Sequence, residues 1–225
     1  MISHKYKCIF IHIPKCAGSS IEAALGHHEM LGAGTQRGMQ DHRTLGEIQP
    51  LSLNLREFDT RTELKRLRWR FKKHSNPANG LTVNSEQYRD YFKFTFVRNP
   101  WARSYSWYRN VMRDERKIAR HGITADCTFK EYLHRFGGTG YLKPQLYWIT
   151  DRRGRADLDF TGRFETLQQD FRAVCEHLGI PQIELPHIVS GGGSNYKEAY
   201  SPDMRECAAR IFSEEIREYG YTFDD

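Results

Sequence analysis

Two short segments of the chain combine small, hydroxyl-bearing and cationic residues in a way that suits a bound phosphate. The first, residues 14–20 with the sequence PKCAGSS, follows a short apolar run. Its small residues let the backbone approach an anion, its two serines can donate hydroxyls, and Lys15 supplies a positive charge. Between a buried strand and the start of a helix, such a loop predicts an anion cradle.

The second segment, residues 98–106, has an arginine at the end of another apolar run and a serine two turns into the helix that follows. Arg98 and Ser106 could hold one phosphate between them. Ligands of open α/β sheets bind beyond the carboxyl ends of the strands, so the two segments share one crevice if their strands are neighbours. Two phosphate sites in one crevice fit a bisphosphorylated nucleotide.

The first loop differs from the P-loop of nucleoside triphosphatases. The pattern Gly-x-x-x-x-Gly-Lys-[Ser/Thr] is absent, because here the lysine precedes the glycine. A kinase would also need magnesium ligands, and Glu22 is the one acidic residue near the loop. A metal-dependent nucleotide kinase is therefore an alternative that lacks its motif.

Strands and helices must alternate to position these segments. A β-branched and aromatic run predicts a strand over residues 7–13, and alternating apolar and polar residues predict another over 91–98. Residues 158–164 are a candidate for a third strand. Capping and periodicity predict helices over 20–25, 44–55, 128–136 and 166–178, one from Asn99-Pro100 onward, and one from Ser201 to Gly220. This order predicts a single α/β domain over residues 1–225, with a mainly parallel sheet flanked by helices and a P-loop-like strand-loop-helix phosphate site.

The helix after Pro100 has an apolar stripe and a polar face. The apolar residues that recur at helical spacing are predicted to face the core; they are Trp101, Tyr105, Tyr108 and Met112. The residues left on the other face are Arg103, Ser106 and Asn110. We expect the polar face to serve the site.

Composition narrows the classes of function. The 225 residues carry 34 Lys and Arg against 28 Asp and Glu, a net charge of +6, which favours an anionic ligand. The five cysteines are scattered and include no Cys-x-x-Cys pair, so we expect reduced thiols. No apolar run approaches the roughly 18 residues that span a bilayer, and the first seven residues are too polar for a secretory signal. We therefore expect no integral membrane segment and a cytoplasmic protein.

Both candidate phosphate segments resemble those of a known family. Residues 14–20 are similar to the 5′-phosphosulfate loop of sulfotransferases that use 3′-phosphoadenosine 5′-phosphosulfate (PAPS), and Arg98 with Ser106 resembles their 3′-phosphate site. Residues 91–100, 162–167 (GRFETL) and 185–187 (LPH) are similar to Golgi-type carbohydrate sulfotransferases, heparan sulfate 2-O-sulfotransferase among them, and to their bacterial relatives. The resemblance implies sulfuryl transfer from PAPS to a hydroxyl of an acceptor, a saccharide, without a metal and with adenosine 3′,5′-bisphosphate (PAP) as product.

The resemblance also assigns site residues. The implied cofactor-binding residues are Lys15, Cys16, Ala17, Gly18, Ser19, Ser20, Arg98, Ser106 and Lys197. In the heparan enzyme a histidine after the first helix is the base, and residues 41–45 (DHRTL) match that region, so His42 is the candidate base. That enzyme has a second histidine two residues earlier, where this chain has Gln40.

These residue types suit the implied chemistry. An imidazole titrates near neutrality, so His42 can take the acceptor hydroxyl's proton during in-line attack on sulfur. Lys15 would stabilise the charge that develops on the leaving phosphate oxygen. Cys16 beside a helix start could be a nucleophile, but direct transfer needs none, and the resemblance makes it a small loop residue.

A non-enzymatic reading stays open beside the kinase: a protein that binds RNA or an anionic glycan. It is motivated by the positive charge and by the basic run at residues 61–73, whose alternative is a solvated helix face. It predicts steeply salt-dependent binding with no need for a nucleotide, whereas the sulfotransferase reading expects no nucleic acid partner. The acceptor of an enzyme would be contacted by residues 32–84 and 119–157, the least family-like parts.

Overall fold

The centre of the molecule is a mainly parallel β-sheet. The computed structural model describes residues 1–27, 40–50, 60–61, 64, 68, 80–185 and 195–225. In these residues four strands lie in the order β1 (Ile2–Ser3), β2 (Cys8–Ile11), β3 (Phe92–Val97) and β4 (Phe160–Arg163). Only β1 is antiparallel to its neighbour, while β2, β3 and β4 run parallel. The α/β fold predicted from the sequence is confirmed.

The two central strands are buried along their whole length. Every residue of β2 and β3 is buried. This fits the continuous apolar sequence of β2, whereas β3 alternates and buries Lys93 and Thr95 between its apolar residues. The Phe10 and Phe94 rings stack across the pair with centroids 5.0 Å apart. At the carboxyl ends Ile11 lies opposite Thr95, whose Oγ1 donates to the Ile11 carbonyl at 2.8 Å. The loops after the two strands therefore open at the same edge of the sheet.

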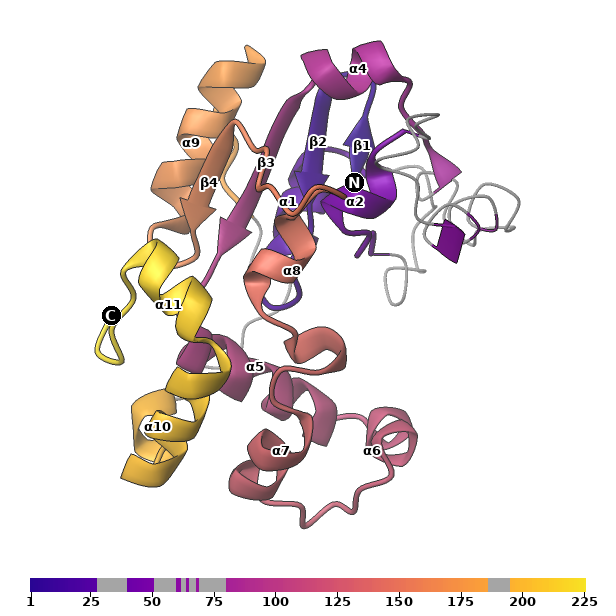
Figure 1. Cartoon of the computed structure of the whole chain (residues 1–225). Coiled ribbons are helices and arrows are strands. Elements are labelled where there is room, and N and C mark those ends of the chain that lie inside the picture. The colour runs from indigo at the N-terminus through magenta and orange to yellow at the C-terminus, as the bar shows by residue number, and fades with distance from the viewer. Residues whose placement is uncertain (28–39, 51–59, 62–63, 65–67, 69–79, 186–194) are drawn as a thin grey trace.

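Helices connect the strands and cover both faces of the sheet. Up to residue 136 the described helices are α1 (Gly18–Ala24), α2 (Leu45–Ile48), α4 (Ser85–Asp90), α5 (Pro100–Met112), α6 (Glu115–His121) and α7 (Phe129–Phe136). The later ones are η3 (Gly140–Leu142), α8 (Gln145–Ile149), α9 (Leu167–Leu178), η4 (Tyr196–Ala199), α10 (Pro202–Ile211) and α11 (Ser213–Tyr219). Figure 1 shows the sheet in the upper half of the molecule and α5, α6, α7 and α10 beyond its carboxyl edge.

Several predicted helices are confirmed, and their ends have physical causes. Helix α7 begins at a reciprocal capping box between Thr128 and Glu131, and α9 ends at Gly179 in the left-handed conformation. Helix α5 begins with Pro100 after Asn99, whose side-chain oxygen accepts the N–H groups of Trp101 and Ala102.

Other predicted elements differ from the structure. The helix predicted over residues 44–55 is shorter in the structure: α2 ends at Ile48, before Pro50, and residues 51–55 lie outside the described residues. The predicted last helix is two helices, α10 and α11, which meet at Phe212. Helices α4, α6 and α8 had no counterpart in the sequence prediction.

The predicted faces of α5 are only partly right. Trp101 is buried, and Tyr105 and Tyr108 pack partly buried against the core, but Met112 is only half-buried. Arg103, predicted on the polar face, is completely buried. Helix α5 is covered on more than one side, because other helices as well as the sheet edge pack around it, so a polar residue can be as enclosed as an apolar one.

The structure also bears on the cysteines, on possible membrane-spanning helices and on the basic run at residues 61–73. The cysteines all lie in described residues and are free, as expected. Across the part of the chain that the structure describes, no helix has the length and apolar character needed to cross a bilayer. Of the basic run at 61–73 only Arg61, Leu64 and Arg68 are described, and they are exposed; the remainder lies outside the described residues.

Candidate functional site

The loop between β2 and α1 has an unusual backbone. Lys15 and Ala17 adopt positive φ angles of 71° and 62°, a conformation that non-glycine residues rarely take. Such strain persists where surrounding structure enforces it, often at functional sites. In the described structure the backbone N–H groups of Ala17, Gly18 and Ser19 make no hydrogen bond. Successive free N–H groups in a loop of this shape form the concave kind of backbone arrangement that can bind an anion.

Cys16 points away from this concave face into the core. Its thiol is buried and donates to Gln145 Oε1 at 3.3 Å. Burial raises the pKa of the Cys16 thiol to about 12, although nearby Arg103 and Arg98 oppose the shift. The thiol is therefore neutral near pH 7 and unsuited to act as a nucleophile, which agrees with its interpretation as a small loop residue.

The loop after β3 brings Arg98 against the first loop. Arg98 Nη1 donates to the Lys15 carbonyl at 3.1 Å, and the guanidinium lies over the Phe164 ring at 3.9 Å. Its Nε is buried without a hydrogen-bond partner. The predicted meeting of the two segments in one place is thus confirmed.

Both cations at this junction lack an acidic partner. Burial, followed by the charges of Arg98, Lys117 and Arg113, lowers the pKa of Lys15 to about 8, with Cys16 opposing the shift. Burial likewise lowers the pKa of Arg98. Among the residues described, no carboxylate forms an ion pair with either side chain. Because an unpaired buried charge is costly, two of them side by side indicate a site for an anionic ligand.

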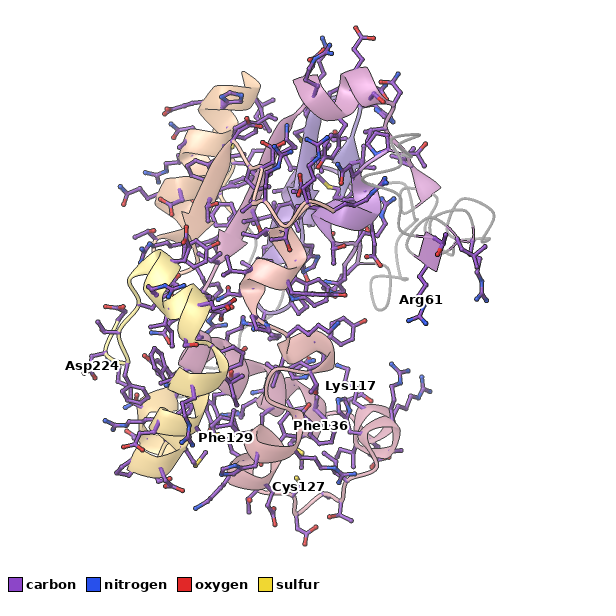
Figure 2. The ribbon with its side chains drawn as sticks, in the orientation of Figure 1. Arg61, Lys117, Cys127, Phe129, Phe136 and Asp224 are labelled. Carbon is purple, nitrogen blue, oxygen red and sulfur yellow. The ribbon has the colours of Figure 1, made fainter. Side chains whose placement is uncertain are left out.

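The two remaining residues predicted to bind the cofactor are Ser106, whose hydroxyl is free in the described structure, and Lys197, which is paired with another residue. Ser106 lies on α5, half-buried, and its hydroxyl makes no hydrogen bond within the described part of the chain. Lys197 on η4 donates to the Asp224 carbonyl at 2.7 Å and lies 3.6 Å from its carboxylate. Asp224 lies at the edge of the molecule (Figure 2). Here Lys197 binds the carboxyl-terminal segment and not the loop; residues 186–194 before it lie outside the described residues.

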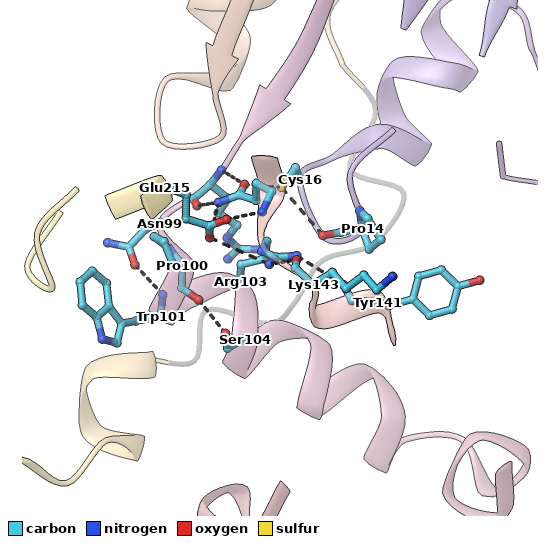
Figure 3. A network of polar contacts seen from close by, with 12 residues as sticks. Pro14, Cys16, Asn99, Pro100, Trp101, Arg103, Ser104, Tyr141, Lys143 and Glu215 are labelled. Atoms are coloured by element: carbon cyan, nitrogen blue, oxygen red, sulfur yellow. Dashed lines mark hydrogen bonds and ion pairs between the residues drawn. The ribbon is translucent and has the colours of Figure 1, made fainter. Parts of the chain in front are cut away.

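A buried polar network, which the sequence prediction missed, holds the two loops in register (Figure 3). Gln145 Oε1 accepts the Arg98 N–H at 2.8 Å as well as the Cys16 thiol, and its Nε2 donates to the Arg98 carbonyl at 2.8 Å. Gln145 Nε2 also donates to Glu215 Oε1 at 3.0 Å, and Arg103 lies 4.0 Å from the same oxygen. Gln145 thus clamps the peptide at the end of β3 and touches the first loop.

His42 lies close to the first loop, and both of its ring nitrogens contact polar groups of other residues. Its Nδ1 is 3.0 Å from the His12 carbonyl, and its Nε2 is 3.1 Å from Gln40 Oε1. Gln40 Nε2 donates to the Ser19 hydroxyl at 2.5 Å. Burial, followed by the charge of His12, lowers the pKa of His42 to about 3, so the ring is neutral near pH 7.

The neutral ring has one N–H, and the His12 carbonyl can only accept, so that N–H belongs at Nδ1. Nε2 then carries a lone pair. The Gln40 amide, turned so that its NH₂ group donates to this nitrogen, would accept the Ser19 hydroxyl with its oxygen. Gln40 thus links the candidate base to the anion-binding loop.

A second histidine, also missed, supports both His42 and the loop. His12 Nδ1 lies 3.0 Å from Glu22 Oε1, and both side chains are buried. Burial raises the pKa of Glu22, but His12 overcomes this and the pKa falls to about 2. The His12 and His42 rings lie 4.2 Å apart, and a Cβ on Gly18 would be 2.0 Å from His12 Cδ2. Gly18 is required because His12 fills the space beneath it.

Comparison with known proteins addresses what this arrangement is for. A family described as "Sulfotransferase family" matches residues 1–222 of the chain. The chain belongs to the sulfotransferase family. This sulfotransferase is also 25% identical over 116 residues to an uncharacterised protein of Archaeoglobus fulgidus, an alignment that covers 52% of the chain and 91% of that protein. No solved structure matches it significantly.

Family membership makes the protein an enzyme of sulfuryl transfer with a hydroxyl acceptor. Of the predicted site residues, the sulfotransferase brings the 14–20 loop, Arg98 and His42 together, whereas Lys197 lies with Asp224. The described residues gather no three His, Cys, Asp or Glu side chains in a way that could hold a metal ion. No motif in the sequence indicated that Gln145 and Glu215 belong to the site, because both lie far along the chain from the loops that they support.

Proposed function

We propose that this sulfotransferase moves a sulfuryl group from PAPS to a hydroxyl of a carbohydrate. The observation that carries the proposal is a pair of partly buried cations, Lys15 and Arg98, which meet at the carboxyl ends of adjacent parallel strands and have no carboxylate partner among the described residues. The free N–H groups of the 14–20 loop and the unpartnered Nε of Arg98 supply donors of the kind that a bisphosphorylated nucleotide needs.

The residues divide the binding between two phosphate positions. The loop N–H groups and Lys15 would hold the 5′-phosphosulfate, and Arg98 with the hydroxyl of Ser106 would hold the 3′-phosphate. PAPS supplies a sulfuryl group bonded to a phosphate oxygen, which is a good leaving group. Lys15 faces this oxygen and stabilises the negative charge that develops there as the sulfur–oxygen bond breaks.

His42 is the proposed base. As the acceptor oxygen forms its bond to sulfur, His42 Nε2 takes the hydroxyl proton, and its Nδ1–H stays on the His12 carbonyl. Burial lowers the pKa of His42 to about 3, so the ring is neutral at neutral pH but a weaker base than an ordinary imidazole; the negative charge of a bound donor would raise this pKa and favour proton transfer. Because Gln40 contacts both Nε2 and Ser19, an acceptor hydroxyl that displaces the Gln40 amide would arrive between the base and the donor loop.

The test is calorimetric binding of PAP, without added metal, to the wild type, Arg98→Ala and Arg89→Ala. Arg89 is a matched control, because it is an exposed arginine that pairs only with Asp90 in the described contacts. A charged hydrogen bond contributes about 1.5–3 kcal/mol, so Arg98→Ala should weaken PAP binding by about tenfold or more, and Arg89→Ala should leave it unchanged. If the wild type does not bind PAP but binds ATP with magnesium, PAPS is not the donor and the kinase alternative is favoured.

A further variant, His42→Ala, tests the proposed base by its kcat for sulfuryl transfer and its affinity for PAP. General-base removal costs about 10²–10⁴-fold, so kcat for sulfuryl transfer should fall by about that factor while PAP affinity is kept. Unchanged turnover in His42→Ala would place the base elsewhere.

A further inference from the structure

Two tyrosines stand out on the surface near the candidate base. Among the residues the structure describes, the exposed large apolar side chains are Leu64, Tyr141 and Tyr147, and both tyrosines are 42% exposed. The Tyr141 ring lies 5.4 Å from the His42 ring, edge to face at 66°. Tyr147 contacts Trp148 and the ammonium of Lys143 but has no ring contact with His42. Tyr141 is therefore the exposed aromatic residue at the reacting end of the site.

The Tyr141 ring is supported from behind by other aromatic rings. Trp107 of α5 lies 4.9 Å away, and Trp148 of α8 lies parallel to it, at 7° and 6.2 Å. Trp148 is itself buried and 6.3 Å from His42. His42, Tyr141 and Trp148 thus form one aromatic group, and Tyr141 carries its exposed surface.

The backbone under Tyr141 is fixed by a buried charge. Arg103 Nη1 donates to the Tyr141 carbonyl at 3.3 Å, and Arg103 Nη2 donates to the Lys143 carbonyl at 2.7 Å. Figure 3 shows the Tyr141 ring pointing away from this network. The Tyr141 hydroxyl makes no hydrogen bond to a described residue. A ring held this way, with a free polar end, is preorganised for a ligand.

We propose that the exposed face of Tyr141 is a platform on which a pyranose ring of the acceptor stacks, so that one of its hydroxyls reaches His42. This inference rests on the proposed function. The carbon-rich face of a pyranose matches an aromatic face, and the ring hydroxyls at its edge can use the phenol, because tyrosine combines an apolar body with a polar end. Tyrosine also loses little conformational entropy when it is ordered against a ligand.

The position of Tyr141 argues for the acceptor and against the adenine of the donor. Its ring contacts are with His42, Trp107 and Trp148, and none is with Arg98, where the nucleotide phosphates would bind. The aromatic ring that the Arg98 guanidinium contacts is instead that of Phe164. Tyr141 lies beside the proposed base and away from Lys15 and Arg98, which would bind the phosphates. It is therefore placed to contact the acceptor, whose hydroxyl is the nucleophile.

The experiment compares the wild type with Tyr141→Ala, Tyr141→Phe and Tyr147→Ala. PAP affinity is measured by calorimetry, and transfer from PAPS is measured with cellotetraose, chitotetraose and a heparosan tetrasaccharide as acceptors and with 4-nitrophenol as a non-sugar. We expect Tyr141→Ala to raise KM for the oligosaccharide that is used by about tenfold, the size of a lost stacking contact of about 1–2 kcal/mol. Tyr141→Phe should keep most of the affinity, and Tyr147→Ala, equally exposed, should match the wild type.

Each other outcome has a definite meaning. An unchanged oligosaccharide KM in Tyr141→Ala overturns the platform and leaves the proposed function standing. A loss of PAP affinity in that variant makes Tyr141 part of the donor site, which also overturns it. Transfer to 4-nitrophenol but to none of the oligosaccharides overturns the pyranose as occupant. A wild type that neither binds PAP nor uses PAPS refutes the proposed function itself.

Discussion

At the scale of single residues, the site is marked by charges without partners. Lys15 and Arg98 are largely buried, have lowered pKa values and form no ion pair with a described carboxylate. Burying a cation without an anion costs free energy that the fold must supply from elsewhere. Such an arrangement persists when a ligand supplies the missing negative charge.

The pKa of Lys15 leads to a pH dependence of donor binding. In the free protein the pKa is lowered from 10.5 to about 8, and a bound anion should raise it again. Above about pH 8 binding must therefore take up a proton, so PAP affinity should fall as pH rises, by up to about tenfold per pH unit. Calorimetry in two buffers of different ionisation enthalpy measures this uptake. Lys15→Met should bind weakly with no break near pH 8, and a wild-type affinity that is flat to about pH 10 would contradict the lowered pKa.

At the scale of elements, the strand-loop-helix unit works because a histidine fills the space below it. His12 follows β2, pairs with Glu22 on α1 and supports both the Gly18 backbone and the His42 ring. The free N–H groups of the loop depend on a backbone that only this packing enforces. The loop, α1 and the 41–45 segment should therefore respond to mutation as one unit.

Gly18→Ala tests that dependence. Its Cβ would lie 2.0 Å from His12 Cδ2, and the ring cannot move away freely because Glu22 holds it. Overpacking of this kind costs about 1–3 kcal/mol, so we expect a lower free energy of urea unfolding together with a clear loss of PAP affinity. Gly46→Ala is the control, because its Cβ would be 3.4 Å from the nearest atom, the Thr150 carbonyl oxygen. Equal behaviour of the two variants would show that His12 can make room.

At the scale of the whole molecule, one buried network joins the sheet edge to the helices beyond it. Arg103 on α5 binds two carbonyls before α8 and pairs with Glu215 on α11, and Glu215 in turn binds Gln145. Gln145 clamps the end of β3. The network of Arg103, Gln145 and Glu215 therefore supports both the loops proposed to bind PAPS and the proposed acceptor platform at Tyr141.

Arg103→Met tests this network through stability. Removing one partner of a buried ion pair costs about 3–5 kcal/mol, because the other charge is left uncompensated. We expect a loss of this size in the free energy of urea unfolding. Arg89→Met, which breaks an exposed pair with Asp90, should change stability little. A similarly small effect of Arg103→Met would show that Glu215 is satisfied by Gln145 alone.

Much of the fold was predictable because its signals are local. The continuous apolar run of β2 shows its burial on both faces directly, and the β-branched and aromatic residues of β3 mark it as a strand although it alternates with Lys93 and Thr95. Capping residues such as Thr128 and stop residues such as Gly179 act within one or two turns. The 14–20 loop and Arg98 could be singled out for the same reason, since each follows directly from a strand end.

What the sequence by itself determined is therefore the three parallel strands, most of the helices, the two segments proposed to bind phosphate and the family that they resemble, but not the short strand β1. Only the tertiary structure decided that Arg103 is buried, that Lys197 binds Asp224, and that the partners of the loops are His12, Gln145 and Glu215. Gln145 lies 47 residues from Arg98 and 70 from Glu215 along the chain. Burial and the choice of a hydrogen-bond partner depend on which elements pack together, and no local pattern of residues specifies contacts over such separations.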